Sequence, residues 1–355
     1  MIIKFIKSFF LSILSIIVIF RVRIKRIKKG AFSSMKDEYH TTFDPRTLIY
    51  LKSTKQIIFV RTQNFFLSLK GISRFNNIIL FNHILNLNAI LGSFLGIKKI
   101  KIYEINTYIL YLILKYIKLT EFHMLDDYRH VQLFSKICKK TNTRLYLYQH
   151  GRFSKSEKLQ KNLKNLYFHK FFVWSNFFKN KLLNLDKRID GKKIFIRKKF
   201  NDFKIKNKVR SNNLLIIHEN NILLQDYKKI IAKIKNTNLG LKIYFKPRPF
   251  QKMNKKLEML LVKEKINIIK YKNIFKSNNN LFFDYLIAFN STMLLEASYF
   301  YITPIMIYKK KPALKDYIND NVFYASNINQ LSKNLKKIFL LRFKTIDKFK
   351  SKVWL

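Results

Sequence analysis

Short apolar runs alternate with helix-like segments along most of this 355-residue chain, and this alternation restricts its fold more than any other feature. Runs of about four to eight residues rich in Ile, Val, Leu and Phe are typical of strands buried on both faces. The segments between them carry apolar residues at helical spacing. Such β-α alternation predicts an α/β fold, in which parallel sheets are covered by helices on both faces.

The strands and helices follow one another in a regular order. We expect strands at 56–61, 77–81, 98–104, 144–149, 168–174, 214–218, 241–246, 266–271, 282–289 and 303–308. We expect helices at 106–119, 128–140, 176–185, 223–235, 251–263 and 292–300. The stretch 186–213 is charged, contains Gly191 and has only brief apolar pairs, which is typical of a connection between domains. We therefore expect a domain at 31–190, a second at 191–355, and a cleft between their strand ends.

The N-terminus has the composition of a membrane anchor. Residues 9–20 are apolar except for Ser12 and Ser15. This run is shorter than the roughly 20 apolar residues of a confident spanning helix. A cluster of basic residues follows it: Arg21, Arg23, Lys25, Arg26, Lys28 and Lys29. Since this cluster suits an anionic cytoplasmic leaflet, residues 1–30 are interpreted as an anchor that lies on the membrane, a short spanning helix, or a buried first helix. No small-residue cleavage pattern follows, so a cleaved signal peptide is not expected.

The net charge of +51, from 71 Lys+Arg and 20 Asp+Glu, has two explanations. A charge this large makes an anionic partner such as a membrane surface plausible. The joint excess of Lys, Asn, Ile, Phe and Tyr is also the bias that an AT-rich genome produces. The basic residues are spread over nearly every segment, whereas nucleic-acid-binding proteins concentrate them on one element, so no nucleic-acid partner is expected. The single cysteine, Cys138, excludes an internal disulfide and a multi-cysteine zinc site.

Two polar clusters follow strands in the first half of the chain. His150 and Gly151 come directly after the strand at 144–149. Histidine has a pKa near working pH and can take a proton from an acceptor hydroxyl, although a turn histidine satisfied by backbone fits the pattern too. Asp126 and Asp127 come after 121–125. Either acid could be a general base, or could simply cap the helix expected at 128–140.

The run Lys246-Pro247-Arg248-Pro249 ends a strand in the second half. Two prolines fix the backbone and hold the side chain between them in an extended geometry. Lys246 and Arg248 could then face phosphate oxygens, which Arg can bind with two hydrogen bonds. The proline frame makes this basic pair more specific than others in a lysine-rich chain.

The run Asn290-Ser291-Thr292 precedes a predicted helix. Hydroxyls and backbone N–H groups at a helix N-terminus form an anion site, and Glu296, one turn along, could accept hydrogen bonds from ribose. The alternative is that Ser291 or Thr292 only caps the helix.

These motifs resemble those of a known group of enzymes. Residues 245–249 resemble the Lys-Pro-His-Pro motif of bacterial GT-B sialyltransferases and related capsule enzymes, and 290–292 resemble their paired Ser/Thr motif. Residues 125–127 are similar to their acidic motif, which supplies the general base. Residues 148–151 resemble the Gln-His-Gly of bacterial surface-polysaccharide transferases and the Trp-His-Gly of the glycerophosphotransferases that make teichoic acids. Arg248 replaces the motif's histidine, and because Arg does not titrate, this departure weighs against CMP-sialic acid as the donor.

The resemblance, which covers about 125–308, implies a GT-B glycosyltransferase of two Rossmann-like domains. It would move a sugar from a nucleotide-sugar donor to a surface polysaccharide, such as capsule or lipopolysaccharide, or to a lipid-linked glycan. With the anchor, this places the enzyme on the cytoplasmic face of the bacterial inner membrane. No cofactor and no metal are expected, because basic groups can replace a divalent cation. The alternatives are a CDP-glycerol-type polyol-phosphate transferase and a non-catalytic basic protein that binds nucleic acid or membranes.

Overall fold

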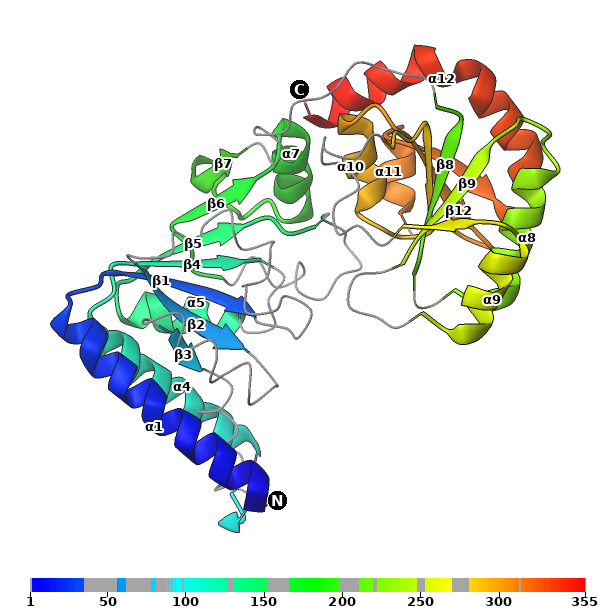
Figure 1. Cartoon of the computed structure of the whole chain (residues 1–355). Coiled ribbons are helices and arrows are strands. Elements are labelled where there is room, and N and C mark those ends of the chain that lie inside the picture. The colour runs from blue at the N-terminus through cyan, green and yellow to red at the C-terminus, as the bar shows by residue number, and fades with distance from the viewer. Residues whose placement is uncertain are drawn as a thin grey trace. The chain divides into compact units, whose positions relative to one another are not determined.

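The chain forms two compact units in the computed structural model (Figure 1). The structure describes residues 2–34, 56–61, 78–80, 88, 90, 92, 94–97, 99–126, 131–151, 153, 166–197, 211–219, 222–247, 253–269, 281–312 and 314–354. Unit 1 comprises Met1–Val173 and Leu182–Phe195, and unit 2 comprises Trp174–Lys181 and Ile196–Leu355. A short stretch near the middle of the chain is therefore part of the C-terminal unit.

Unit 1 is built on a seven-stranded sheet in the order β3-β2-β1-β4-β5-β6-β7. The strands are β1 (Lys29–Ser34), β2 (Gln56–Arg61), β3 (Ile78–Leu80), β4 (Glu121–Leu125), β5 (Arg144–Tyr148), β6 (Lys170–Val173) and β7 (Ile194–Ile196). The pairs from β3 across to β6 are parallel. The strand order reverses between β1 and β4, and such a switch point is where open α/β sheets bind ligands.

The described residues of unit 1 include the helices α1 (Ile2–Ile24), α4 (Lys99–Ile117) and α5 (Val131–Lys140), and α7 (Asn176–Leu185) begins in unit 2 and ends in unit 1. A 3-10 turn, η4 (Gly191–Lys193), precedes β7. Aromatic rings fill the space between α5 and the sheet. Phe122 stacks on Phe134 with ring centroids 4.6 Å apart, and Phe59 meets both rings edge-on. These three side chains are completely buried, so this cluster anchors α5 to the strands that carry the site.

Unit 2 repeats the same topology with six parallel strands in the order β10-β9-β8-β11-β12-β13. The strands are β8 (Asn213–Ile217), β9 (Lys242–Lys246), β10 (Asn267–Ile268), β11 (Tyr285–Ala288), β12 (Thr303–Tyr308) and β13 (Tyr324–Asn327). The helices are α8 (Leu224–Lys235), α9 (Lys255–Lys263), α10 (Met293–Tyr299), α11 (Lys315–Asn319) and α12 (Leu331–Trp354), with a 3-10 turn, η5 (Ile328–Gln330). The switch point lies between β8 and β11.

The prediction of two parallel-sheet α/β domains is confirmed. The strand predicted at 98–104 is wrong, because residues 99–104 lie within α4. Its alternation of Lys and Ile mimics strand periodicity, but no glycine or proline separates it from the helical pattern that follows. The interpretation of the N-terminus as an anchor stays a prediction. Among the residues that the structure describes, no helix combines the length and apolar character needed to cross a membrane.

Candidate functional site

The two clusters predicted in the first half of the chain meet at neighbouring strand ends in unit 1. Leu125 of β4 pairs with Tyr148 of β5, so Asp126 and His150 leave the sheet side by side. The carboxylate Oδ1 of Asp126 accepts a hydrogen bond of 2.9 Å from the backbone N–H of His150. Asp126 is buried, with 5% of its surface exposed, so this contact is sheltered from water. The structure thus gives Asp126 a positioning contact; its catalytic role stays a prediction.

The turn after β5 is held by a second side chain. Gln149 is buried, its backbone N–H donates to the carbonyl of Phe172 on β6 at 2.9 Å, and its Nε2 donates to the carbonyl of Gly151 at 2.7 Å. These contacts fix the backbone on both sides of His150, whose side chain is half-buried. Asp127 lies outside the described residues.

In unit 2, a residue that the sequence did not single out connects the two predicted motifs. Glu219 follows β8, and its carboxylate Oε1 accepts the backbone N–H groups of Phe289 and Asn290 at 2.7 and 2.8 Å. Its Oε2 also accepts from Asn290, at 3.0 Å. On the other side of β8, the N–H of His218 donates to the carbonyl of Lys246 at 2.9 Å. The Lys-Pro and Asn-Ser-Thr motifs therefore flank one strand end, at the switch point of the sheet.

Glu219 is itself held in place from α8. The hydroxyl of Tyr227 accepts the backbone N–H of Glu219 at 2.8 Å and donates to its carbonyl at 3.3 Å. Burial raises the pKa of Tyr227, so this hydroxyl keeps its proton. Glu219 follows an apolar strand in the sequence, as the predicted site residues do. A single carboxylate after a strand forms no distinctive motif, so the sequence did not single it out.

Lys246 ends β9 and is buried, with 5% of its surface exposed. Burial lowers the pKa of its ammonium group, because a charged amine is disfavoured away from water. Perturbed groups of this kind, at a strand end that faces a ligand-binding edge, are candidates for function. Arg248, the other basic residue of the motif, lies outside the described residues.

Of the residues just before α10, Ser291 caps the helix and Asn290 is exposed. The hydroxyl of Ser291 accepts the N–H of Met293 at 3.2 Å, so Ser291 has the capping role that its sequence position allowed. Thr292 occupies the N-cap position without a capping hydrogen bond from its side chain. Asn290 is exposed, and Glu296 is half-buried in the first turn of the helix. Binding of a ligand by Asn290, Thr292 or Glu296 stays a prediction.

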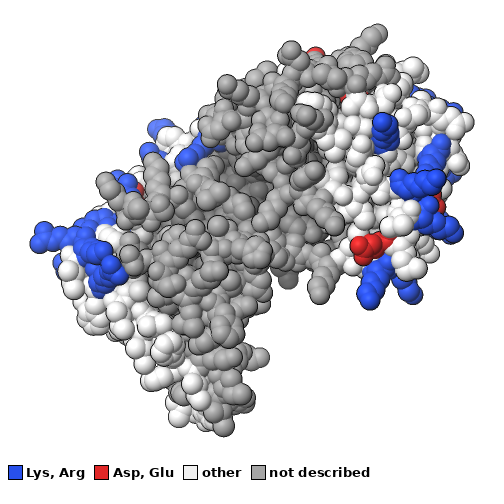
Figure 2. Space-filling view, in the orientation of Figure 1, with Lys and Arg blue, Asp and Glu red and all other residues white. Residues whose placement is uncertain are grey.

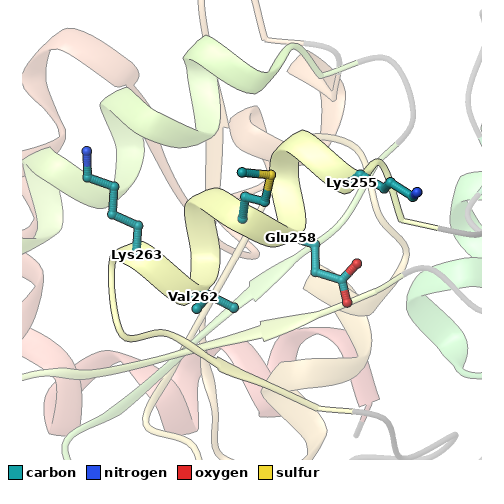
Figure 3. Close-up of a pocket in the computed structure, with 5 residues that line it drawn as sticks. Lys255, Glu258, Val262 and Lys263 are labelled. Atoms are coloured by element: carbon teal, nitrogen blue, oxygen red, sulfur yellow. The ribbon is translucent and has the colours of Figure 1, made fainter.

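A shallow hollow of 640 Å³ lies elsewhere in unit 2 (Figure 3). It is lined by Lys255, Glu258, Met259, Val262 and Lys263, all from α9. Met259 and Val262 are largely exposed, and the lining includes no residue from the strand ends described above. This hollow therefore does not bear on the candidate site.

Comparison with known proteins shows the fold. No protein-family model and no curated protein sequence matches the chain. Similar solved structures include UDP-GlcNAc 2-epimerase from Neisseria meningitidis bound to UDP-GlcNAc, at 10% identity and a TM-score of 0.53 over 92% of this chain and 93% of that one. Another is UDP-GlcNAc 2-epimerase from Methanocaldococcus jannaschii in complex with UDP-GlcNAc and UDP, at 14% identity and a TM-score of 0.50 over 87% and 91%.

A third match is MurG from Acinetobacter baumannii, at 8% identity and a TM-score of 0.50 over 92% of this chain and 94% of that one. The matches extend over nearly the whole of both chains, so they include both units. The chain accordingly has the GT-B fold of two Rossmann-like units. At these identities the comparison describes architecture and carries no residue-level assignment.

Proposed function

We propose that this chain is a glycosyltransferase that moves a sugar from a nucleotide-sugar donor to a surface polysaccharide or a lipid-linked glycan. The observation that carries the proposal is the cluster at three adjacent strand ends of unit 2, where Glu219 follows β8, Lys246 ends β9 and Asn290 follows β11. A buried cation beside the half-buried hydroxyls of Ser291 and Thr292 suits the phosphates of a nucleotide.

Unit 2 binds the donor in this proposal. Lys246 and Arg248 stabilise the negative charge that builds on the leaving phosphate, and preorganised charge of this kind usually contributes most to the rate enhancement of an enzyme. Glu219 fixes the turn at 289–290, which keeps Asn290 and Thr292 in place for the nucleotide. Glu296, in the first turn of α10, accepts hydrogen bonds from the ribose hydroxyls. These roles need no metal ion.

Unit 1 supplies the base in this proposal. His150 takes the proton from the acceptor hydroxyl as that oxygen attacks the anomeric carbon and the bond to the donor phosphate breaks. Asp126 is a positioning residue, because its carboxylate holds the backbone of His150. Asp127 is the alternative base, as the resemblance to the sialyltransferase acidic motif implies.

The neighbouring structures support a nucleotide sugar as the substrate class and suggest where to start. The Neisseria and Methanocaldococcus enzymes are named as complexes with UDP-GlcNAc, so UDP-linked sugars are the first donors to test. The same names raise a second candidate function, epimerisation of the donor at C2, which would need no acceptor.

A donor panel separates these functions. The purified full-length chain is incubated with UDP-, GDP-, CMP- and CDP-linked donors, with and without glycan acceptors, and nucleotide release is measured. We expect acceptor-dependent release from one sugar donor. Turnover of CDP-glycerol alone would identify a polyol-phosphate transferase, and an epimerised donor without acceptor would identify an epimerase. Salt-sensitive DNA binding without any turnover would favour a non-catalytic protein.

The site assignment has its own test. The variant Arg248→Ala should lose transfer while its circular dichroism spectrum and melting temperature stay unchanged. Lys263→Ala, which removes an exposed charge from α9, is the matched control and should keep full activity. Undiminished transfer by Arg248→Ala would show that the nucleotide binds elsewhere.

We also propose that the enzyme works at the cytoplasmic face of the bacterial inner membrane, where nucleotide sugars and lipid-linked acceptors are both available. The basic flank of α1 supports this location. Fractionation of cells that express the chain tests it: recovery with washed inner membranes is expected, and recovery only in the clarified cytosol would overturn it.

A further inference from the structure

The helix α1 turns three serines toward the protein, together with Leu11, Val18, Ile19 and Val22, and carries an apolar stripe on its outward side. Ser8, Ser12 and Ser15 are buried, with 2%, 6% and 0% of their surfaces exposed. The hydroxyls of Ser12 and Ser15 donate to carbonyls one turn back in the same helix, at 2.7 and 2.9 Å, so they can face the protein without a cost in hydrogen bonds. The opposite stripe is exposed by 41% to 58% and consists of Ile6, Phe9, Phe10, Ile13, Ile16, Ile17 and Phe20. A helix whose exposed stripe is the more apolar one indicates an apolar surrounding.

The neighbouring helix α4 extends this apolar surface. Its exposed apolar residues, Ile105, Tyr108, Leu112 and Tyr116, lie three or four residues apart and so form one stripe. The two helices run side by side in unit 1 (Figure 1). Phe20 of α1 and Tyr116 of α4 meet edge-on with ring centroids 5.7 Å apart. The two stripes therefore join into one surface, here called the α1–α4 face.

Among the side chains that the structure describes, exposed basic residues gather at the carboxyl end of the α1–α4 face. Arg23 lies with its guanidinium 5.8 Å from the ring centroid of Tyr116, so the carboxyl ends of both helices lie together. The exposed basic residues at this end are Arg21, Lys25, Arg26, Lys28, Lys29, Lys115 and Lys118. Figure 2 shows a blue cluster of basic side chains on unit 1 beside an area of uncharged residues. An apolar surface bordered by cations matches a bilayer that presents anionic headgroups over an apolar interior.

We propose that the α1–α4 face docks on an anionic lipid membrane, with both helices lying along its surface. The inward stripe of α1 packs against β3 and α4 of unit 1, so only the outward stripe is open to lipid. A second copy of the chain is the competing occupant. It would bring an identical cationic cluster to the same interface, and like charges oppose such pairing. The bilayer supplies the opposite charge.

Vesicle sedimentation of the full-length chain tests the proposal, in neutral phosphatidylcholine vesicles and in vesicles that also contain phosphatidylglycerol. Binding should be strong only to the anionic vesicles and should weaken with salt. The triple variant Arg21→Gln, Lys25→Gln, Arg26→Gln should lower the partition constant about 100-fold. Equal binding to both vesicle types, or equal binding by the triple variant, would overturn the role of the cations.

The apolar residues of the α1–α4 face are tested with one double variant in α1 and a control double variant in unit 2. The double variant Ile13→Gln, Ile17→Gln should lose vesicle binding, because it removes two exposed side chains from the centre of the face. Met259→Gln, Val262→Gln removes two apolar side chains of α9 that are even more exposed, and this variant should bind as the unchanged chain does. Loss of binding in both double variants would contradict a specific face. Loss in neither, with a dimer in analytical ultracentrifugation that Ile13→Gln, Ile17→Gln abolishes, would assign the face to a second copy.

The depth of docking can be measured with a fluorescent label. The native thiol of Cys138 is completely buried, and burial raises its pKa, so a cysteine introduced elsewhere is labelled selectively. A polarity-sensitive dye at Ile13→Cys should shift to the blue on anionic vesicles, and at Met259→Cys it should not. The same spectrum at both positions would overturn the docking. Since these assays contain no nucleotide, their failure would leave the proposed transfer reaction untouched.

Discussion

At the scale of single residues, Lys246 is the side chain whose position most needs a functional explanation. Burial removes water from the ammonium group of a lysine, which costs free energy. Lys246 is 95% buried at the end of a strand, and this burial lowers its pKa. A buried cation is stabilised when an anionic ligand binds beside it. Ligand binding then offsets the free-energy cost of burying Lys246.

The variant Lys246→Met should separate binding from stability. Methionine fills a similar volume without a charge, and it removes the desolvation cost of the ammonium group together with its contacts, so we expect a free energy of unfolding at pH 7 within about 1 kcal/mol of that of the unchanged chain. Donor binding should weaken by about 10- to 100-fold, the effect of one lost charged hydrogen bond. Urea unfolding and calorimetric titration measure the two quantities. A clear loss of stability with unchanged donor affinity would make Lys246 a structural residue.

The lowered pKa of Lys246 also makes the free energy of unfolding depend on pH. Its pKa in the folded chain lies below the ordinary value of 10.5, so between these two values the unfolded chain binds more protons than the folded one. Stability therefore rises as the pH increases through the folded pKa toward 10.5. Subtracting the Lys246→Met curve from that of the unchanged chain isolates this rise from the other lysines. A difference that falls with pH over this range would contradict the assigned direction.

At the scale of elements, the central strand β1 depends on its glycine. A Cβ atom on Gly30 would lie 2.8 Å from Leu119 Cδ1 and 2.8 Å from Phe122 Cδ2. Phe122 is fully buried and stacked on Phe134, so it has little freedom to move away. Gly30→Ala should therefore cost about 1–3 kcal/mol of unfolding free energy. In Gly191→Ala the nearest atom is 3.6 Å away, so this control should be nearly neutral in the same denaturation measurement.

The sheets were largely predictable from the sequence, but β1, β7 and β13 were not. The strand 56–61 and the strand 303–308 were predicted to the residue, because both are apolar runs with clear ends. β1 has the sequence Lys-Gly-Ala-Phe-Ser-Ser, which contains no β-branched residue and little apolar surface. Its position comes from pairing with β2 and β4. This pairing is a tertiary interaction, which the local sequence pattern does not reveal.

The candidate site was predictable to the extent that its residues sit in motifs. Asp126 with His150, and Lys246 with Asn290, were singled out by polar residues after strands. The structure brings the first pair to neighbouring strand ends and places the second pair on the two sides of β8. Glu219 was missed because its importance comes from a hydrogen bond to residues 70 positions later in the chain. Such a pairing depends on the strand order, which the sequence pattern does not specify.

Glu121 of β4 forms ion pairs with Lys29 of β1 and Arg144 of β5, so the pairing of these three strands should weaken in acid. Burial alone would raise the pKa of its carboxyl group, but Lys29 at 3.3 Å and Arg144 at 2.8 Å lower it below 4.5. The carboxylate therefore contributes stability above its unfolded pKa and loses this contribution as the pH falls through the folded pKa. Because both partners are about half exposed, Glu121→Gln should cost only about 1 kcal/mol at pH 7.

Urea denaturation at pH 7 and at pH 3 checks this contribution. The cost of Glu121→Gln should be larger at pH 7 than at pH 3. Glu258→Gln removes an exposed carboxylate from α9 and should change neither value by more than a few tenths of a kcal/mol. A cost that is as large at pH 3 as at pH 7 would show that packing, and not charge, ties Glu121 to β1 and β5.

At the scale of the whole molecule, the division into units does not follow the order of the chain. Unit 2 takes in Trp174–Lys181 in addition to its C-terminal sequence. Inside this unit, Trp174 stacks on Trp354 from the last turn of α12, with ring centroids 6.0 Å apart, and Phe178 lies 5.8 Å from the same ring. The hydroxyl of Ser175 donates to the carbonyl of Val353. Residues nearly 180 positions apart thus share one core in unit 2.

Trp354 should therefore act on unit 2 as a whole. Its indole Nε1 donates to the carbonyl of Leu295 and to the hydroxyl of Ser298, both at 3.1 Å, and its ring meets Tyr299 edge-on at 5.6 Å. Trp354→Ala should cost about 3–5 kcal/mol and should speed hydrogen exchange in α10 and in residues 174–181 together. Leu340→Ala, on an exposed turn of the same helix, should leave both unchanged. Exchange that speeds only in the last turn of α12 would mean that this end frays independently, since a shared core must loosen on all of its sides at once.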